Sequence, residues 1–183
     1  MEILYIALLT LIAATIGTIT GFGTSTLMIP VLAIFFPPVE AIFLVAIIHW
    51  FGNIWKVTLF RSGFNPRLLI LFGAVGLATS YLGAYISLGA NEEILLRVLG
   101  AFLAGYALFV AFQSKFKIPA GNITALSGGA LSGFFAGMFG IGGAIRSAFL
   151  SAFDLPKAVF ISTAGAISLL VDSTRIIRIG FAP

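Results

Sequence analysis

Charged side chains are scarce in this sequence, and one of them stands alone in a long apolar stretch. Arg146 is the only charged residue between Lys117 and Asp154, and it follows a glycine cluster by one helical turn. On the lipid side of a membrane helix such a residue costs about 3 kcal/mol or more, so we expect Arg146 to face the interior. There it either recognises an oxyanion with its planar guanidinium, forms an internal ion pair, or reaches toward the side where Asp154 lies.

Glycines break the apolar runs at two places. The residues of interest are Gly21, Gly23, Thr24 and Ser25 at the first break and Gly140, Gly142 and Gly143 at the second. A helix that resumes after a break has free N–H groups and a partial positive charge at its N-terminus, which suits an anion. The sequence therefore predicts two anion-binding cradles, assisted by Arg146. The alternative is that the glycines only allow close helix packing.

Polar residues line one face of each of two further apolar segments. The first face carries His49, Asn53 and Lys56, and the second carries Ser168, Asp172 and Arg175. This spacing places each set on one helical face, so both faces are predicted to point inward and to line a path. Asp172 can take a proton during transport, and His49 can do so near neutral pH. The alternatives are an Asp172–Arg175 ion pair at the membrane interface and a His49 that is only a buried hydrogen-bonding residue.

The composition places the chain in a membrane, and we expect the cell (inner) membrane. Hydrophobic residues make up 60% and charged residues 9% of the 183 residues, against about half and about a quarter in soluble domains. The absence of cysteine excludes thiolate chemistry. One histidine and six carboxylates predict neither a metal site nor a cofactor. The basic residues are spread beside apolar runs, which favours a lipid bilayer over nucleic acid as the partner.

Charge-free runs and their breakers predict an all-α polytopic membrane protein. The 37 residues from Ile3 to Val39 carry no charge, and one helix of that length would measure about 55 Å against a hydrocarbon core of about 30 Å. We therefore predict a span over 3–20, a break at 21–23, and a shorter helix that either completes the crossing or re-enters the membrane. The further predicted spans are 40–60, 67–88, 93–113, 119–152 and 156–177.

Basic residues alternate between the two predicted sides of the membrane. One side receives seven of them, namely Lys56, Arg61, Arg67, Lys115, Lys117, Arg175 and Arg178. The other side receives Arg97, Lys157, Glu40, Glu92, Glu93 and Asp154. The positive-inside rule predicts that the first side is cytoplasmic, and the N-terminus is then predicted to be cytoplasmic as well.

An internal repeat emerges when the chain is shifted by 119 residues. Gly21 then falls on Gly140, Pro37 on Pro156, and the polar face of the second span on that of the last span. We predict a first transmembrane repeat over 1–118 and a partial second repeat over 119–183. Four spans per repeat make the two repeats parallel, with a binding site between them. The second repeat stops after two spans, so we expect either a fragment or further spans from another chain or a homo-oligomer.

Three motifs at these places resemble the sulfite exporter TauE/SafE family, also called the sulfonate-uptake permeases. They are GFGTSTLMIP (21–30), FRSGF (60–64) and GMFGIGGAIR (137–146). The resemblance covers essentially the whole chain and implies a multi-pass transporter of sulfur-containing anions, not an enzyme. The sequence departs from the family pattern at Thr24-Ser25, where many members continue the glycine run. It also departs at Leu44-Val45, where a Thr-Ser pair is expected.

The function predicted from the sequence is permease-type transport of a small anion, such as sulfite or a sulfonate, by alternating access. The alternative is a membrane scaffold or a subunit of a larger complex that does not itself transport. An intramembrane enzyme is disfavoured because nucleophilic catalysis needs an oriented base beside the nucleophile, and His49 and Asp172 lie on separate spans.

Overall fold

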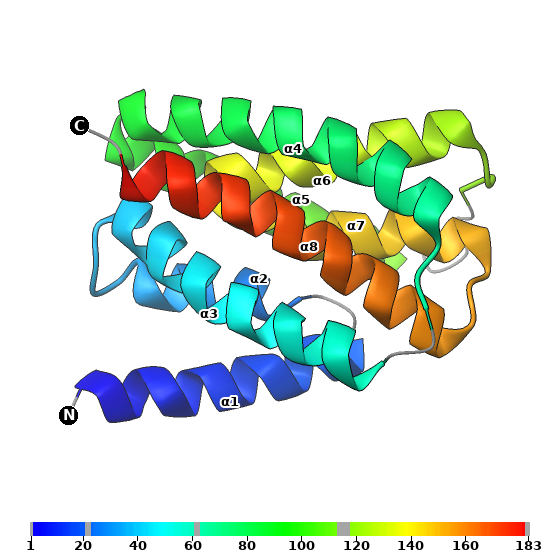
Figure 1. The fold of residues 1–183 in the computed structure, drawn as a ribbon. Helices are drawn as coiled ribbons and strands as arrows, with labels where there is room; N and C mark the ends of the chain where they lie inside the picture. The colour runs from blue at the N-terminus through cyan, green and yellow to red at the C-terminus, as the bar shows by residue number, and fades with distance from the viewer. Residues whose placement is uncertain (1, 21–22, 61–62, 113–117, 182–183) are drawn as a thin grey trace.

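The computed structural model describes residues 2–20, 23–60, 63–112 and 118–181 (Figure 1). In these ranges every regular element is helical and no strand occurs. The elements are α1 (Glu2–Thr20), α2 (Thr24–Leu32), α3 (Pro38–Leu59), α4 (Pro66–Gly89), α5 (Glu92–Phe112), α6 (Asn122–Phe139), α7 (Gly143–Leu150), a 3-10 turn (Ser151–Phe153) and α8 (Lys157–Gly180). The predicted all-α fold is confirmed, and the predicted spans match α1, α3, α4, α5, the α6–α7 pair and α8.

Proline, asparagine and glycine set the helix boundaries by local chemistry. Pro38 and Pro66 stand at the first positions of α3 and α4, where a missing N–H costs no intrahelical hydrogen bond. Asn65 caps α4, because its side chain accepts a hydrogen bond of 3.0 Å from the Leu68 N–H. Gly140 ends α6 in the left-handed conformation with φ 74°, which glycine adopts without strain.

Three helices in the described part of the chain are long and apolar enough to cross a membrane, judged by length and composition: α3, α4 and α8. They contain 22, 24 and 24 residues, which corresponds to about 33–36 Å. Large apolar side chains are exposed along the bundle, among them Trp55, Ile70 and Ile123, and apolar surface of this extent fits a lipid environment. That α1, α5 and the α6–α7 pair also cross stays a prediction.

Each break joins a helix to a second, shorter helix that turns back along it. The start of α1 and the end of α2 share an apolar groove of about 660 Å³, lined by Tyr5, Ile6, Leu9, Val31, Leu32, Phe35 and Phe36. In the second pair, a Cβ atom added to Gly128 near the start of α6 would lie 2.6 Å from Cβ of Phe149 at the end of α7. Both pairs are therefore helical hairpins, and α2 returns toward the end at which α1 begins.

α8 runs antiparallel to α3 and parallel to α4 (Figure 1). Near the start of α8, Thr163 Oγ1 accepts a hydrogen bond of 3.0 Å from the Asn65 N–H, just after α3. At the other end, a Cβ atom on Gly180 would lie 3.1 Å from the ring of Phe43 in the first half of α3. Since α3 and α8 correspond under the 119-residue shift, their antiparallel course differs from the parallel orientation predicted for the repeats. The prediction of four spans per repeat did not count α2 as a separate segment. Because α2 turns back along α1, the chain changes direction once more than predicted before the second repeat begins.

Helices α4 and α6 are packed most closely, through glycines. A Cβ atom on Gly129, Gly133 or Gly137 would lie 2.6, 2.3 or 2.1 Å from the carbonyl oxygen of Phe72, Gly76 or Ser80, respectively. Backbones can approach this closely only where no side chain intervenes. α4 and α6 lie on either side of the predicted boundary at residue 118, and the division into 1–118 and 119–183 stays a prediction.

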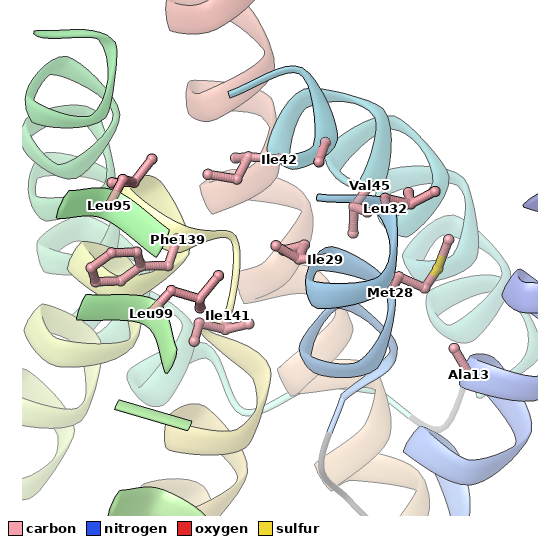
Figure 2. Close-up of a cluster of buried hydrophobic side chains, with 11 residues drawn as sticks. Ala13, Met28, Ile29, Leu32, Ile42, Val45, Leu95, Leu99, Phe139 and Ile141 are labelled. Carbon is pink, nitrogen blue, oxygen red and sulfur yellow. The ribbon is translucent and has the colours of Figure 1, made fainter. Parts of the chain in front are cut away.

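An apolar core holds the second break in place (Figure 2). Phe139 and Ile141, which flank Gly140, are each 1% exposed and cluster with Leu95 and Leu99 of α5. Ile29 of α2 belongs to the same cluster. The core therefore ties the second hairpin to α5 and α2 without contributing polar groups.

The structure redistributes the charges that the sequence assigned to two sides. One end of the bundle is where α3 meets α4 and α7 meets α8, and it carries Arg67, Asp154 and Lys157. At the opposite end α1 begins and α8 ends. That end carries Glu40, Glu92, Glu93, Arg97 and Arg178. Arg178 and Lys157 thus exchange their predicted sides, and Asp154 changes sides with Lys157, because α8 runs in the opposite direction to that expected. Arg61, Lys115 and Lys117 lie outside the described residues. The N-terminus and the predicted basic side lie at opposite ends, so only one of them can be cytoplasmic.

Candidate functional site

The two glycine breaks meet inside the bundle. Gly23, with φ 85°, precedes the first residue of α2, and Gly142 precedes the first residue of α7. A Cβ atom on Gly23 would lie 3.4 Å from Cα of Gly143 and 3.7 Å from the backbone nitrogen of Ala144. The structure thus brings together the two regions that the sequence predicted as anion cradles. Gly21 lies outside the described residues.

The helices that resume after the breaks start at this contact and run away from it in opposite directions. α2 returns along α1 and α7 returns along α6, so the two N-termini face each other. The free N–H groups and partial positive charges of their first turns are therefore close together. Thr24 and Ser25 in the first turn of α2 are buried, and Ser25 Oγ has no hydrogen-bond partner among the described residues. This is the geometry that an anion cradle requires.

The glycines of the second break differ in which neighbouring atoms can approach them. A Cβ atom on Gly140 would lie 2.2 Å from Cδ1 of Ile29 and 3.0 Å from Nη1 of Arg175. One on Gly142 would lie 2.4 Å from the carbonyl oxygen of Ser132 and 3.3 Å from Nη2 of Arg146. Gly140 therefore ends α6 and lets Arg175 approach, whereas Gly142 and Gly143 belong to the start of α7. Both buried guanidinium groups lie against this break.

Arg146 lies inside the protein, as the sequence predicted. It is 3% exposed, and its Nη1 donates a hydrogen bond to Ser168 Oγ of α8. No carboxylate among the described residues lies within 4.0 Å of it, and its Nε has no hydrogen-bond partner there. Of the three predicted arrangements, a direct ion pair and a reach toward Asp154 are not observed. What remains is an interior guanidinium with donors to spare.

The polar faces of α3 and α8 point toward each other. His49 Nδ1 lies 2.7 Å from Asp172 Oδ2, and Asn53 Nδ2 donates to the same oxygen over 3.3 Å. Beside them, Trp50 Nε1 donates to Ser173 Oγ over 2.9 Å. The sequence correctly predicted that both faces point inward. That they line a transport path stays a prediction.

Arg175 belongs to the polar face that was predicted to point inward, but the sequence did not single it out as a site residue. It is fully buried, donates to Asp172 Oδ1 over 3.0 Å, and donates to the Ala136 carbonyl over 2.8 Å. The predicted Asp172–Arg175 pair therefore exists, but it lies in the core and not at the membrane interface. The available signal was its position: Arg175 follows Asp172 by one turn on the polar face, and α8 continues to Gly180.

Together these side chains form a polar cluster at the meeting point of the hairpins with α3 and α8. Its members are His49, Asn53, Arg146, Ser168, Asp172 and Arg175, all of them buried. Two guanidinium groups face one carboxylate, so the cluster carries an excess of one positive charge with a neutral imidazole. Burying a charge without a partner is costly, and an anion bound at the cluster would offset that cost. No metal-binding group of three or more His, Cys, Asp or Glu occurs among the described residues.

Comparison with known proteins supports what the hairpins and the charge suggest. A family model described as "Sulfite exporter TauE/SafE" matches residues 6–181, a range that contains both breaks and the whole polar cluster. No curated protein and no solved structure matches the chain. The match extends over nearly the entire chain and includes every described helix that bears on the cluster. The protein therefore belongs to the TauE/SafE sulfite exporter family.

Proposed function

We propose that this protein, which by its family is a membrane transporter of the permease type, transports a small oxyanion such as sulfite or a sulfonate. The anion binds where the two breaks meet, between the first turns of α2 and α7 and beside Arg146. The observation that carries this proposal is the excess of buried positive charge at that point. An oxyanion would both offset that charge and accept the unused donors.

The chemistry of the site fits an oxyanion better than a cation or a neutral solute. A guanidinium offers several N–H groups in a fixed plane, which match two oxygens of one sulfur centre. Helix N-termini add backbone N–H groups without adding formal charge. Gly23, Gly142 and Gly143 carry no Cβ that would fill the space next to these N–H groups. The contributing residues are Gly23, Thr24, Ser25, Gly142, Gly143 and Arg146, with Gly21 as a further candidate.

Alternating access follows from two hairpins that approach from opposite ends of the bundle. Transporters with inverted repeats bind substrate near the membrane centre at the repeat interface, often at broken helices. Here the closely packed α4–α6 pair offers a fixed support. Movement of the first hairpin with α3 against this support would open the cluster to one side and then to the other. His49 and Asn53 would then line the path opposite Ser168 and Asp172.

We place the protein in the cell (inner) membrane with the end that carries Arg67 and Lys157 in the cytoplasm. In the sequence Arg61 lies in the connection between α3 and α4, and the positive-inside rule favours that orientation. The N-terminus then lies on the opposite side, contrary to the orientation predicted from the sequence. Two partner predictions remain, a homo-oligomer and spans from another chain. Light scattering in detergent tests both, because it gives the molar mass of the protein particle.

The test is thermal unfolding of the purified protein in detergent, titrated with sulfite, methanesulfonate, sulfate, phosphate and chloride. Binding to the folded state raises the apparent stability in a saturable way. We expect a shift with at least one sulfur oxyanion. Arg146→Gln should weaken that binding by about 10- to 100-fold, since a hydrogen bond to a charged group contributes about 1.5–3 kcal/mol.

The matched control is Arg178→Gln. Arg178 lies on α8, where its guanidinium stacks on the rings of Tyr81 and Tyr85 of α4, with centroids at 5.8 and 5.3 Å, outside the polar cluster. The control should bind the anion like the wild type. Equal losses in both variants would contradict the role of Arg146. A well-folded protein that no anion stabilises would instead favour the alternative of a scaffold or subunit that does not transport.

A further inference from the structure

The chain contains one histidine, His49. Its two ring nitrogens have different hydrogen-bond partners in the polar cluster. Nδ1 lies 2.7 Å from Asp172 Oδ2, whereas no hydrogen bond reaches Nε2 from the described residues. A carboxylate oxygen can only accept, so the neutral ring carries its proton on Nδ1 and keeps a lone pair on Nε2. Asn53 Nδ2 then donates to Asp172 and not to the ring. The geometry presents His49 as a base with a free nitrogen.

Asp172, the other candidate for a proton, already accepts hydrogen bonds at both carboxylate oxygens. Its Oδ1 accepts from Arg175 Nη2 over 3.0 Å, and its Oδ2 accepts from His49 and Asn53. A proton on Oδ2 would compete with two donors, and a proton on Oδ1 would weaken the ion pair with Arg175. Asp172 therefore orients the ring of His49 and fixes its tautomer, as carboxylates do for histidines elsewhere.

His49 is also the member of the cluster that keeps the most contact with its surroundings. It is 9% exposed, against 3% for Arg146 and Asp172, 1% for Asn53 and none for Arg175. A proton-exchanging group needs such contact with water at some stage of the cycle. The buried guanidiniums, which stay charged, cannot serve this purpose.

We propose that His49 binds and releases the proton that accompanies the anion, that it does so at Nε2, and that Asp172 is the residue that positions it. This inference rests on the proposed function. Nε2 takes a proton from water as the anion binds and returns it to water when the anion leaves. The second positive charge attracts the anion, and the anion in turn favours the imidazolium, because linked binding is reciprocal.

The charges around His49 are consistent with this arrangement. From α8, Asp172 and Arg175 face it; on its own helix, Lys56 is half-buried and its Nζ donates to Asn53 Oδ1 over 3.4 Å. Arg146 of α7 joins the cluster through its hydrogen bond to Ser168 of α8. Two further helices pack on α3. The sequence of α2 from Thr24 to Leu32 has no ionisable residue, and α5 contributes the exposed Glu92, Glu93 and Arg97 and the half-buried Tyr106. Lys56, Arg146 and Arg175 oppose a second positive charge until an anion arrives.

The first experiment needs no anion. With ¹⁵N-histidine, nuclear magnetic resonance of the protein in lipid nanodiscs reports one ring, and its two nitrogen shifts give the tautomer and the protonated fraction. We expect the neutral ring to carry its proton on Nδ1, and Asp172→Asn to remove that preference. A proton on Nε2 in the wild type would overturn the assignment.

The second experiment adds methanesulfonate, whose charge stays constant where histidine titrates. At fixed pH we expect the protonated fraction of the ring to rise with bound anion. In weak buffer, the wild type should take up as much as one proton per anion. His49→Gln retains a hydrogen-bond donor toward Asp172 but lacks the second positive charge. It should bind the anion more weakly and, at saturating anion, take up no proton. Binding without proton uptake, or equal uptake in both proteins, would overturn the inference and leave the proposed function intact. If no anion stabilises the protein, the proposed function fails, and coupling to the anion fails with it.

Discussion

At the scale of single residues, the contrast between two arginines explains how charge is used here. Arg175 is fully buried, with a carboxylate on one side and the Ala136 carbonyl on the other. Arg97 also pairs with a carboxylate, that of Glu93, but the two side chains are 76% and 71% exposed. Water already satisfies the exposed pair, whereas the buried pair depends on its protein partners. The same ion-pair chemistry therefore has very different consequences at the two places.

We predict that Arg175→Met destabilises the protein by about 3–5 kcal/mol, because it leaves Asp172 buried with one fewer donor. Arg97→Met should change the free energy of unfolding by about 0–1 kcal/mol. The measurement is reversible unfolding in mixed detergent micelles, followed by helical circular dichroism. Equal effects would mean that Arg175 is hydrated in solution and that the cluster is more open than the structure indicates.

At the scale of helices, glycines occupy two kinds of position in this protein. Gly23 and Gly142 precede α2 and α7, whose first turns have free backbone N–H groups. Gly129, Gly133 and Gly137 lie within the regular helix α6 and admit the backbone of α4. The sequence analysis offered anion cradles and close packing as alternatives. Close packing is evident for the glycines inside α6. Gly142 at the second break is packed as closely, since a Cβ atom on it would lie 2.4 Å from the Ser132 carbonyl oxygen. Both alternatives therefore stand at the breaks, and the cradle stays a proposal.

We predict that Gly137→Ala destabilises the α4–α6 contact by about 1–3 kcal/mol, the usual cost of overpacking. Its Cβ would lie 2.1 Å from the Ser80 carbonyl oxygen, a backbone atom that cannot turn away. The control is Gly105→Ala on α5, where a Cβ meets nothing within 4 Å. That substitution should be neutral or slightly stabilising, since alanine is the better helix former. Thermal unfolding of both variants measures the difference, and comparable losses would contradict the close approach of α4 and α6.

At the scale of the whole molecule, the direction in which each helix runs determines how the two predicted repeats are related. α2 and α7 each turn back, α3 and α8 run antiparallel, and α4, α6 and α8 run parallel (Figure 1). Two helices that match under the 119-residue shift therefore point in opposite directions. If the repeat is real, it is an inverted one, which is a common plan among transporters with broken helices.

We predict that Phe64→Cys is labelled by a membrane-impermeant maleimide only from the cytoplasm, and Glu92→Cys only from outside. The chain has no native cysteine, so each variant carries one reactive thiol. The two positions flank α4, which spans about 36 Å at 24 residues, and both side chains are exposed. Labelling of intact cells and of inverted vesicles gives the answer. The reverse pattern would return the N-terminus to the cytoplasm, and labelling of both from one side would contradict the architecture.

The sequence by itself determined the helices, their breaks and the inward polar faces. These depend on local chemistry: apolar runs of membrane length, proline at helix starts, glycine where the backbone must turn, and polar residues one turn apart. It also identified His49, Asn53, Arg146, Ser168 and Asp172 as interior residues, since a polar group on a lipid face is costly.

Only the tertiary structure decided the direction of the helices and the contacts between distant segments. A glycine break permits a helix to stop, but whether the next helix continues or returns depends on what it packs against. For that reason the sequence could not determine that Gly23 meets Gly143. Nor could it show that Arg175 lies in the core, because a charge near a helix end looks interfacial until neighbouring helices cover it. The joining of two breaks and two guanidiniums into one cluster is a property of packing.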